Sequence, residues 1–492
     1  MARGEKREWM MSGFLLVVAI FSVRLCSFTT VQSTLHPFYA DSYHFQVIGK
    51  YWTQGKVPYV DLWDSKGPFI FFFDAIGYAS HHGLVVLQVP SLWVTLLFFR
   101  EMFQKCMAAW KSVLYCLVMA AMLSLTYEGG NTVEEPLLPF LAASISCIYG
   151  WIQRTERGEW RHDPKKAYVY GLTVGVCLFS RATNMLGIGG AVLVIFCALL
   201  IHRENKNLFQ NLLWGMLGVS TVVVPFSIYF AARGALGDMV YAAFTYNMVY
   251  TASSSAAVDT KKLVRFLVGI LPAICLFLWG LFLTLRGRAR RATGITWMAM
   301  ALLPLVWLLR SNMYLHYAAV VYPYSALLIV EAHRESKKAP RVLLALFLLA
   351  GIAAGGMRYQ NQRLALTAVK GAEENGSYAL TRAEQMTAET IPKNELSSFT
   401  AYNCNPKIYL DLGICPATRF FAFQDWAVHE GGESFRNLFL DDYARADSKW
   451  ILVQTTEGKD VQIEDILEED YTCVKSLSIS ESEEYRLYRE KK

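Results

Sequence analysis

The sequence predicts a polytopic all-α membrane protein of about eleven transmembrane helices, followed by a small α/β domain. Of its 492 residues, 54% are hydrophobic and only 18% are charged, whereas soluble proteins carry about 25% charged residues. Apolar runs such as Leu263–Leu285 and Val342–Met357 recur along the chain, and runs of roughly 20 apolar residues span a bilayer as helices. After Met357 the sequence becomes markedly more polar, which marks the start of the second domain.

The basic residues predict the orientation of the helices, because Lys and Arg collect in cytoplasmic loops. Basic clusters lie at the N-terminus and at 100–111, 154–166, 202–206, 286–291 and 333–341. All of them face the cytoplasm if the spans fall near 12–32, 84–103, 110–127, 136–153, 167–182, 184–202, 208–232, 263–285, 292–310, 314–332 and 341–357. The sequence therefore predicts a cytoplasmic N-terminus and an extracytoplasmic C-terminal domain.

One apolar run has to be left out of this count. Pro68–Ser80 is short and contains Asp74, so an interfacial or re-entrant segment suits it better than a span. The preceding stretch then belongs to a long first external loop at 33–83. The domains are predicted as 1–357, a transmembrane domain whose catalytic part is this loop, and 358–492, an extracytoplasmic α/β domain.

The polar C-terminal domain is expected to have about 130 residues, an ordinary domain size. It contains three short β-like runs separated by acidic, helix-prone stretches: "KIYLDLG" from Lys407, "TRFFAF" from Thr418 and "KWILVQTT" from Lys449. Cys404 and Cys415 lie in this domain, where an extracytoplasmic location permits a disulfide.

The predicted outer face gathers charges beside the bilayer, where ionisable groups are costly and are functional candidates by default. They are Asp41, Asp61, Asp64, Lys66, Glu128, Glu134, Glu135, Arg181, Arg310 and His316. A carboxylate in such a set can take a proton from a nucleophile, and Lys or Arg can hold a phosphate. An enzyme that uses a lipid-phosphate donor needs both at the membrane edge.

Each of these residues also has a structural alternative. Asp41 suits a helix N-cap, and the aspartates before Gly67-Pro68 suit a turn. Lys66 can snorkel to the interface. Glu134 and Glu135 precede Pro136 at a helix start, where acids complement the helix dipole. Arg181 and His316 are compatible with anchoring at the lipid interface.

Four stretches together resemble a known family: "DSYHFQVIGKYWTQGKVPYVDLWDSKGPFIFFFDAIGYA" from Asp41, "EGGNTVEEPLLPF" from Glu128, "SRATN" from Ser180 and "HYAAVVYPY" from His316. This combination resembles the bacterial members of glycosyltransferase family 39, the superfamily of protein mannosyltransferases and the aminoarabinose transferase of lipid A. The resemblance implies a GT-C type membrane fold. It also implies inverting transfer of a sugar from a polyprenyl-phosphate donor to an acceptor, on the outer face of the cytoplasmic membrane.

The resemblance also implies roles for individual residues. Asp41 occupies the place of the general base, although many relatives have an Asp-Glu pair where this chain has Asp41-Ser42. Lys66 matches a lysine that meets the donor phosphate. Further candidates for the phosphate are Arg181, Arg310 and His316, and candidates for the acceptor or a metal are Asp64, Glu134 and Glu135. No cofactor is firmly implied, and a divalent metal is left open because the sequence cannot show converging oxygen ligands.

The expected partners are membrane lipids, the lipid-linked donor and an acceptor that is a lipid, a glycan or a protein. Nucleic acid is not expected, since no basic-aromatic patch occurs. Two other functions stay open. A flippase or transporter would place charges near the bilayer midplane, often within internal repeats. A polysaccharide polymerase or ligase would share the outer Arg and His residues but would not predict the acidic first loop.

Overall fold

The computed structural model describes residues 3–27, 40–80, 83–123, 125–249, 260–287, 290–335, 338–376, 378–458 and 460–491. The chain forms two compact units. The first is drawn from 1–30, 84–228 and 256–362, and the second from 31–83, 229–255 and 363–492. The first external loop thus groups with the C-terminal part of the chain, and its residues 33–39, 81 and 82 lie outside the described residues.

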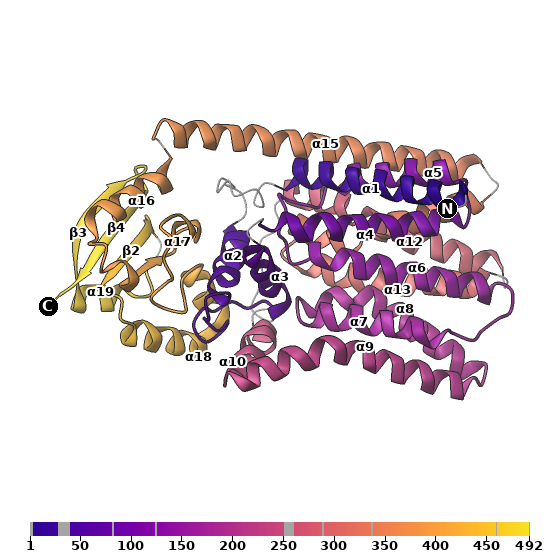
Figure 1. The fold of residues 1–492 in the computed structure, drawn as a ribbon, viewed down its shortest axis with the longest axis horizontal. Coiled ribbons are helices and arrows are strands. Elements are labelled where there is room, and N and C mark those ends of the chain that lie inside the picture. The colour runs from indigo at the N-terminus through magenta and orange to yellow at the C-terminus, as the bar shows by residue number, and fades with distance from the viewer. Residues whose placement is uncertain are drawn as a thin grey trace. The chain divides into compact units, whose positions relative to one another are not determined.

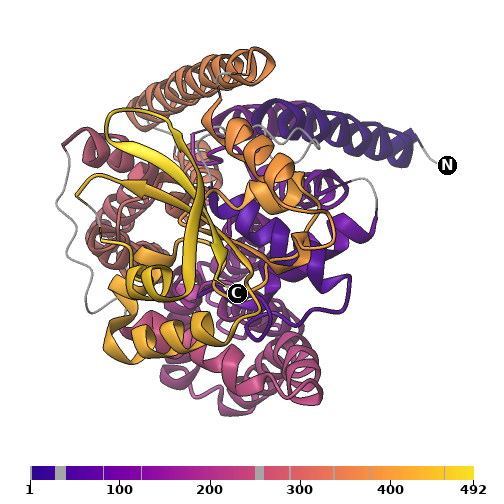
Figure 2. The same cartoon turned by 90° about the vertical axis from the view of Figure 1, so that its left-hand side faces the viewer.

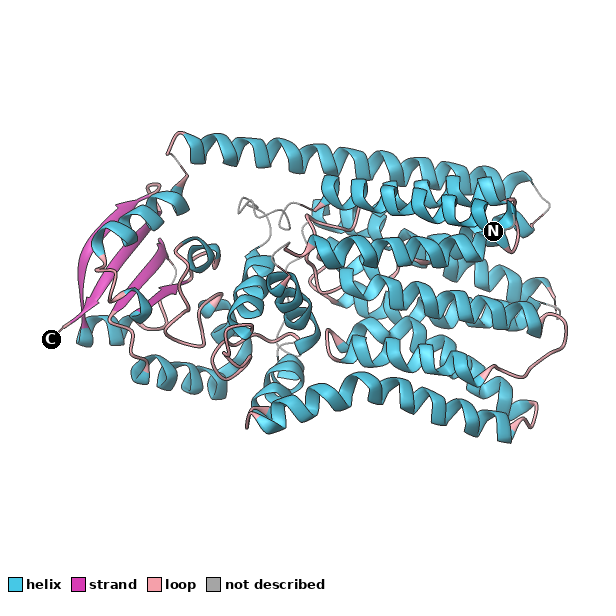
Figure 3. Cartoon of the chain, viewed as in Figure 1, coloured by secondary structure: helices cyan, strands magenta, loops and turns pink. Residues whose placement is uncertain are grey.

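The first unit consists of helices, most of them long and apolar (Figures 1 and 3). They are α1 (Arg3–Cys26), α4 (Val85–Gln104), α5 (Ala109–Leu123), α6 (Leu138–Thr155), α7 (Pro164–Leu178), α8 (Leu186–Ile201), α9 (Asn205–Ala232), α12 (Thr260–Arg286), α13 (Arg291–Arg310), α14 (Tyr324–Arg334) and α15 (Lys338–Glu374). The ends of two of them, 229–232 of α9 and 363–374 of α15, belong to the second unit. The all-helical membrane part predicted from the sequence is confirmed.

Seven helices among the described residues are long and apolar enough to cross a membrane. They begin at Glu5, Val85, Glu135, Ala182, Asn205, Thr260 and Arg291. Helix α3 (Pro68–Ala79) has only 12 residues, too few for a bilayer of about 30 Å at 1.5 Å per residue. Its length agrees with the interfacial or re-entrant interpretation. The count of eleven spans stays a prediction.

Small residues allow the membrane helices to approach one another closely, as is typical of helix contacts in lipid. Helices α12 and α13 meet through Gly280 and Gly294. A Cβ atom at Gly280 would lie 2.7 Å from the Gly294 carbonyl oxygen, and one at Gly294 would lie 2.5 Å from the Gly280 carbonyl oxygen. Any larger side chain at either position would push the two backbones apart.

Two predicted spans differ from the observed helices. The predicted span 314–332 is broken into a 3-10 helix (Leu315–Val320) and α14, because Pro323 stands at the start of α14 and cannot continue a preceding helix. The predicted span 341–357 is the start of the much longer α15, which continues to Glu374. Residues 358–374 contain no proline and many good helix formers.

The second unit contains a four-stranded sheet with helices (Figure 2). Its strands are β1 (Phe399–Tyr402), β2 (Trp450–Thr456), β3 (Tyr471–Ser478) and β4 (Glu483–Glu490), in the order β1-β2-β4-β3. Strand β1 is parallel to β2, and the other two pairings are antiparallel. Its helices are α2 (Ala40–Trp52), α3, α10 (Leu236–Val240), α16 (Ala379–Thr390), α17 (Lys407–Asp411), α18 (Gln424–Arg445) and α19 (Glu464–Asp470).

The mixed α/β character predicted for the chain after Met357 is confirmed, but only one of its three strand assignments is correct. "KWILVQTT" contains β2. "KIYLDLG" is wrong as a strand, because Pro406 begins the short helix α17 and Lys407 pairs with Asp411 one turn later. "TRFFAF" is wrong as a strand and runs as a loop whose aromatic side chains pack on other segments. All ten cysteines, including Cys404 and Cys415, are free thiols.

Candidate functional site

The loop between α2 and α3 is a tightly hydrogen-bonded turn. The Asp61 carboxylate accepts a hydrogen bond from the Val57 N–H at 2.6 Å, and the Tyr59 N–H donates to the Leu62 carbonyl at 2.7 Å. The Tyr59 hydroxyl donates to the carbonyl of Lys66 at 2.8 Å. These bonds hold the "DSK" stretch (64–66) in one conformation, and they give Asp61 the structural role that its position before Gly67-Pro68 suggested.

Asp64 is the centre of this stretch and is buried. Its Oδ1 accepts from the backbone N–H of Lys66 at 2.9 Å and lies 3.8 Å from the Lys66 Nζ. Its Oδ2 lies 3.3 Å from Nδ1 of His44. The Lys66 ammonium also donates to the Ser65 hydroxyl at 3.1 Å, and the Lys66 side chain remains 18% exposed. Asp64 therefore positions a cation whose charge can still reach a ligand.

His44 joins this cluster from α2, one helical turn after Asp41. Its Nε2 lies 3.1 Å from the Trp63 carbonyl oxygen. Burial lowers the pKa of His44, while the carboxylates of Asp64 and Asp41 oppose the shift. Asp41 itself lies in the first turn of α2 and is partly exposed. His44 was not among the residues predicted from the sequence, although its spacing of three residues from Asp41 places both on one helix face.

Part of the C-terminal segment covers this cluster within the second unit. The Trp63 N–H donates to the Arg419 carbonyl at 2.9 Å. The His44 ring meets the edge of Phe421 with 4.5 Å between centroids. Phe423, in a left-handed backbone conformation with φ 56°, lies 5.5 Å from the same ring. The loop "TRFFAF" thus helps to exclude water from His44.

Asn247 secures the same stretch from another segment. Its Nδ2 donates to the Ser65 carbonyl at 2.6 Å. The neighbouring Tyr246 hydroxyl donates to the Ala427 carbonyl at 2.9 Å, which ties this segment to α18. Residues 229–249 therefore hold the "DSK" turn together with the C-terminal segment.

Glu134 and Arg181 form a buried ion pair in the first unit. The Arg181 Nη1 donates to the Glu134 Oε1 at 2.6 Å, and the guanidinium lies 4.1 Å from the ring centre of Tyr317. Several buried polar atoms around this pair have no hydrogen-bond partner among the described residues. They are Oε2 of Glu134 and the side-chain oxygens of Ser180, Thr183 and Asn184. Since buried polar atoms are normally paired, these oxygens are available to a ligand or water that supplies donors.

Glu135 differs from its neighbour because its carboxylate is fully engaged. Its Oε2 accepts from the Asn131 N–H at 2.6 Å and from the Gln88 amide at 2.8 Å, and its Oε1 accepts from the Tyr127 hydroxyl. Glu135 thereby fixes the turn that precedes α6.

Glu128 forms the second charged group of the first unit. Its Oε2 lies 2.5 Å from Nδ1 of His316, and its Oε1 accepts from the guanidinium of Arg358. Burial would raise the pKa of Glu128, but the His316 hydrogen bonds and the Arg358 charge outweigh it and lower the pKa to about 2. His316 is buried against Tyr314 and Tyr317. Of the other phosphate candidates, Arg310 ends α13 and is exposed.

The described residues bring together no group of three or more His, Cys, Asp or Glu side chains that could hold a metal. Glu134 and Glu135 are adjacent in sequence but engage different partners. A metal at these residues stays a prediction.

Comparison with known proteins identifies the family of the chain. Residues 6–342 match the family described as "Putative competence-induced protein Ccs4 N-terminal domain". The chain belongs to this family. The Ccs4 N-terminal match includes every predicted site residue from Asp41 to His316 and ends before Arg358 and the covering segment at Phe421.

A crystal structure of ArnT from Cupriavidus metallidurans in the apo state is similar over 99% of this chain and 98% of that chain, with 12% sequence identity and a TM-score of 0.47. No curated protein matches the chain.

Proposed function

We propose that the chain is a membrane glycosyltransferase that moves a sugar from a polyprenyl-phosphate donor to an acceptor hydroxyl on the outer face of the cytoplasmic membrane. The transfer inverts the anomeric configuration, with Asp41 as general base and Lys66 at the donor phosphate. The N-terminus lies in the cytoplasm and the C-terminal α/β part outside.

One observation carries this proposal: a partly exposed carboxylate, Asp41, lies one helical turn before His44, which contacts Asp64, the carboxylate that holds the Lys66 ammonium. A displacement at an anomeric carbon needs a base for the attacking hydroxyl and a cation for the departing phosphate, and Asp41 and Lys66 supply them. Asp41 accepts the acceptor's hydroxyl proton while that oxygen bonds to the anomeric carbon. The bond to the phosphate oxygen breaks, its electron pair leaves with the phosphate, and Lys66 stabilises the added charge.

The proposed roles of the surrounding residues follow from their contacts. Asp64 holds Lys66 through its backbone N–H and its charge, and His44 packs against Asp64 on the side covered by Phe421. We assign Asp64 to positioning rather than to acceptor contact.

The buried group around Glu134 supports a hydroxyl-rich ligand, because its unpaired oxygens need donors. We assign it to a sugar or acceptor hydroxyl. Arg181 and His316 already have carboxylate partners in Glu134 and Glu128, so we place them after Lys66 among the phosphate candidates, together with the exposed Arg310. The resemblance of these segments to glycosyltransferase family 39 supports the same donor class.

The experiment compares cell-envelope glycans by mass spectrometry in the native host. Strains carry the wild-type chain, a deletion, Asp41→Asn, or the control Asp441→Asn, whose side chain is 69% exposed on α18, all at matched membrane levels. General-base catalysis contributes about 10²- to 10⁴-fold, so Asp41→Asn should lose the same sugar as the deletion while Asp441→Asn retains it.

Three outcomes overturn the proposal. If Asp41→Asn matches the wild type while the deletion loses a sugar, Asp41 is not the base. If the deletion strain instead accumulates a long glycan on a diphosphate lipid, the chain is a polymerase or ligase. If the deletion strain traps a complete lipid-linked sugar on the inner leaflet, the chain is a flippase.

A further inference from the structure

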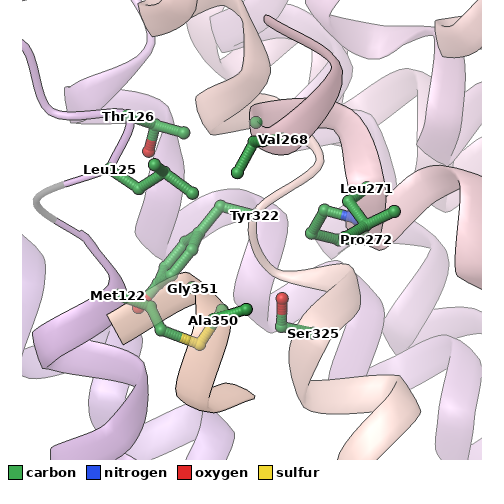
Figure 4. A pocket seen from close by; sticks show the side chains of 11 residues that line it. Met122, Leu125, Thr126, Val268, Leu271, Pro272, Tyr322, Ser325, Ala350 and Gly351 are labelled. Atoms are coloured by element: carbon green, nitrogen blue, oxygen red, sulfur yellow. The ribbon is translucent and has the colours of Figure 1, made fainter. Parts of the chain in front are cut away.

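A cavity of about 110 Å³ lies among the helices of the first unit (Figure 4). Its lining comes from the end of α5 and from α12, α14 and α15, and includes Met122, Thr126, Gly269, Pro272, Ser325 and Gly351. Its lining is almost wholly apolar. A cavity of 150 Å³ holds benzene, so this one has room for a hydrocarbon segment of roughly four methylenes.

Cations lie along the same helix faces, one to two turns from the cavity. On α12, Arg265 precedes Gly269 by four residues and Pro272 by seven, so the three share one face. On α15, Arg358 follows Gly351 by seven residues, which is two turns or about 10 Å along the axis. Each helix thus presents a cation and an apolar cavity wall on one stripe.

These two cations are close enough to influence each other. The pKa of Arg358 is lowered first by burial and then by the positive charge of Arg265, while Glu128 raises it. Lys262, one turn before Arg265, lies 4.5 Å over the Tyr314 ring. Glu128 is the carboxylate paired with Arg358, so positive charge is in excess at this end of the cavity.

Three buried polar atoms, two in the cavity lining and one on Arg358 two turns along α15, have no partner among the described residues. They are Nε of Arg358, Oγ1 of Thr126 and Oγ of Ser325. Thr126 and Ser325 both line the cavity, and Figure 4 shows their hydroxyl oxygens in red. Buried hydroxyls without a partner are rare, so a ligand here should offer oxygen acceptors as well as hydrocarbon.

We infer that this cavity binds an anionic glycerophospholipid, with the headgroup phosphate at Arg265 and Arg358 and one acyl chain between α12 and α15. Basic pockets between membrane helices are suited to such headgroups. The ester carbonyls of the lipid accept hydrogen bonds from Thr126 and Ser325. A polyprenyl phosphate shares the phosphate and the hydrocarbon but has no acyl ester carbonyl, and it would leave both hydroxyls unpaired. The site uses only residues of the first unit and does not depend on the proposed transferase activity.

The test measures lipid binding to the delipidated full chain in detergent by native mass spectrometry, with dioleoylphosphatidylglycerol as the probe. Gly351→Leu fills the cavity, because a Cβ there lies 2.8 Å from the movable end of Met122. The matched control is Gly356→Leu on the same helix, where a Cβ has open space. Gly351→Leu should weaken binding at least tenfold, and Gly356→Leu should leave it unchanged at an equal melting temperature.

Charge and esters are tested in the same way. Arg265→Gln should weaken phosphatidylglycerol binding about tenfold, whereas Arg291→Gln, an exposed arginine at the start of α13, should not. Thr126→Val with Ser325→Ala should weaken phosphatidylglycerol more than undecaprenyl phosphate. Binding unaffected by Gly351→Leu overturns the site. The glycerophospholipid assignment is overturned if undecaprenyl phosphate binds the wild type more tightly than phosphatidylglycerol does and if Gly351→Leu abolishes the binding of both lipids. It is also overturned if inorganic phosphate alone displaces phosphatidylglycerol.

Discussion

The two units place charges beside apolar helices in different ways. In the second unit the cluster of Asp41, His44, Asp64 and Lys66 comes from a single stretch of 26 residues at 41–66. In the first unit the charged pairs join distant segments, since Glu134 and Arg181 are 47 residues apart and Glu128 and Arg358 are 230 apart. One site is assembled by a local turn and the other by helix packing.

This difference separates charges that can still contact a ligand from charges that are paired within the protein. In the first unit Glu128 and Glu134 each face an arginine, and breaking a buried pair is strongly destabilising. In the second unit the Lys66 ammonium is 3.8 Å from Asp64 and partly exposed, and Asp41 is partly exposed. A charge beside the membrane is therefore a weaker functional signal than a charge that its neighbours leave accessible.

The largest effect on stability should come from Glu134→Gln. It leaves the Arg181 guanidinium buried without its counter-charge, and removing one partner of a buried pair costs about 3–5 kcal/mol. Chemical unfolding in detergent measures the loss. The control is Glu101→Gln, which breaks a half-exposed pair with Lys105 on α4 and should cost under about 0.5 kcal/mol. Adding Arg181→Gln to Glu134→Gln should restore much of the stability. Equal small losses in both single variants would mean that the first unit is not held by this pair.

A somewhat smaller effect is expected at Glu128, and it should depend on pH. The pKa of Glu128 is lowered from its ordinary 4.5 to about 2. The contribution of its carboxylate to the free energy of unfolding is therefore complete above pH 4.5 and is lost as the pH falls towards 2. The shift corresponds to roughly 3 kcal/mol at neutral pH. Unfolding measured from pH 7 to pH 3 should show a gap between wild type and Glu128→Gln that narrows on acidification. A gap that stays constant would show that Glu128 acts through packing and not through its charge.

The sequence predicted more of the local cluster than of the distant pairs, and the reason is physical. Asp64 and Lys66 are two residues apart, so a turn brings them together whatever the rest of the chain does. Arg358, by contrast, lies in the middle of the long helix α15, far along the chain, and nothing in its neighbourhood indicates Glu128 as its partner. The packing of the helices brings Glu128 and Arg358 together. The spacing of residues in a single sequence does not indicate which helices pack against each other.

The fold shows the same division. Long apolar runs predicted the membrane helices well, because hydrophobic length is a sufficient signal in a bilayer. The strand assignments at Lys407 and Thr418 failed, because short runs of mixed aromatic and apolar residues suit a strand, a helix or a covering loop equally. The covering role of Phe421 over His44 depends on contacts between segments more than 370 residues apart, as their numbering shows.

Lys66→Gln tests whether the local cluster is available to a ligand. Hydrogen bonds to charged groups are worth about 1.5–3 kcal/mol, so kcat/KM for a polyprenyl-phosphate sugar should fall about 10- to 100-fold with little change in unfolding. The matched control is Lys56→Gln, which removes an exposed lysine paired with Asp61 in the same loop. Equal activity losses in both variants would point to a general effect of loop charge. A loss of stability in Lys66→Gln without a kinetic effect would make Lys66 a structural residue.

The smallest effect is expected for His44→Gln, which should change how the stability of the chain depends on pH. Burial lowers the pKa of His44, so the unfolded chain binds a proton that the folded chain resists. The contribution of His44 to the free energy of unfolding is therefore complete above the ordinary pKa of about 6.5. Below that pH it falls by up to about 1.4 kcal/mol per pH unit. His44→Gln should remove this part of the acid sensitivity between pH 6.5 and 5.5, while His429→Gln, whose side chain is 83% exposed, should not. His162 in the first unit has its pKa lowered to about 4 by burial and contributes with the same sign, so the informative quantity is the difference in slope between wild type and His44→Gln. If the two slopes coincide, the ring is already protonated beside Asp64 in the folded chain, and the cluster carries one more positive charge towards a phosphate than Lys66 alone supplies.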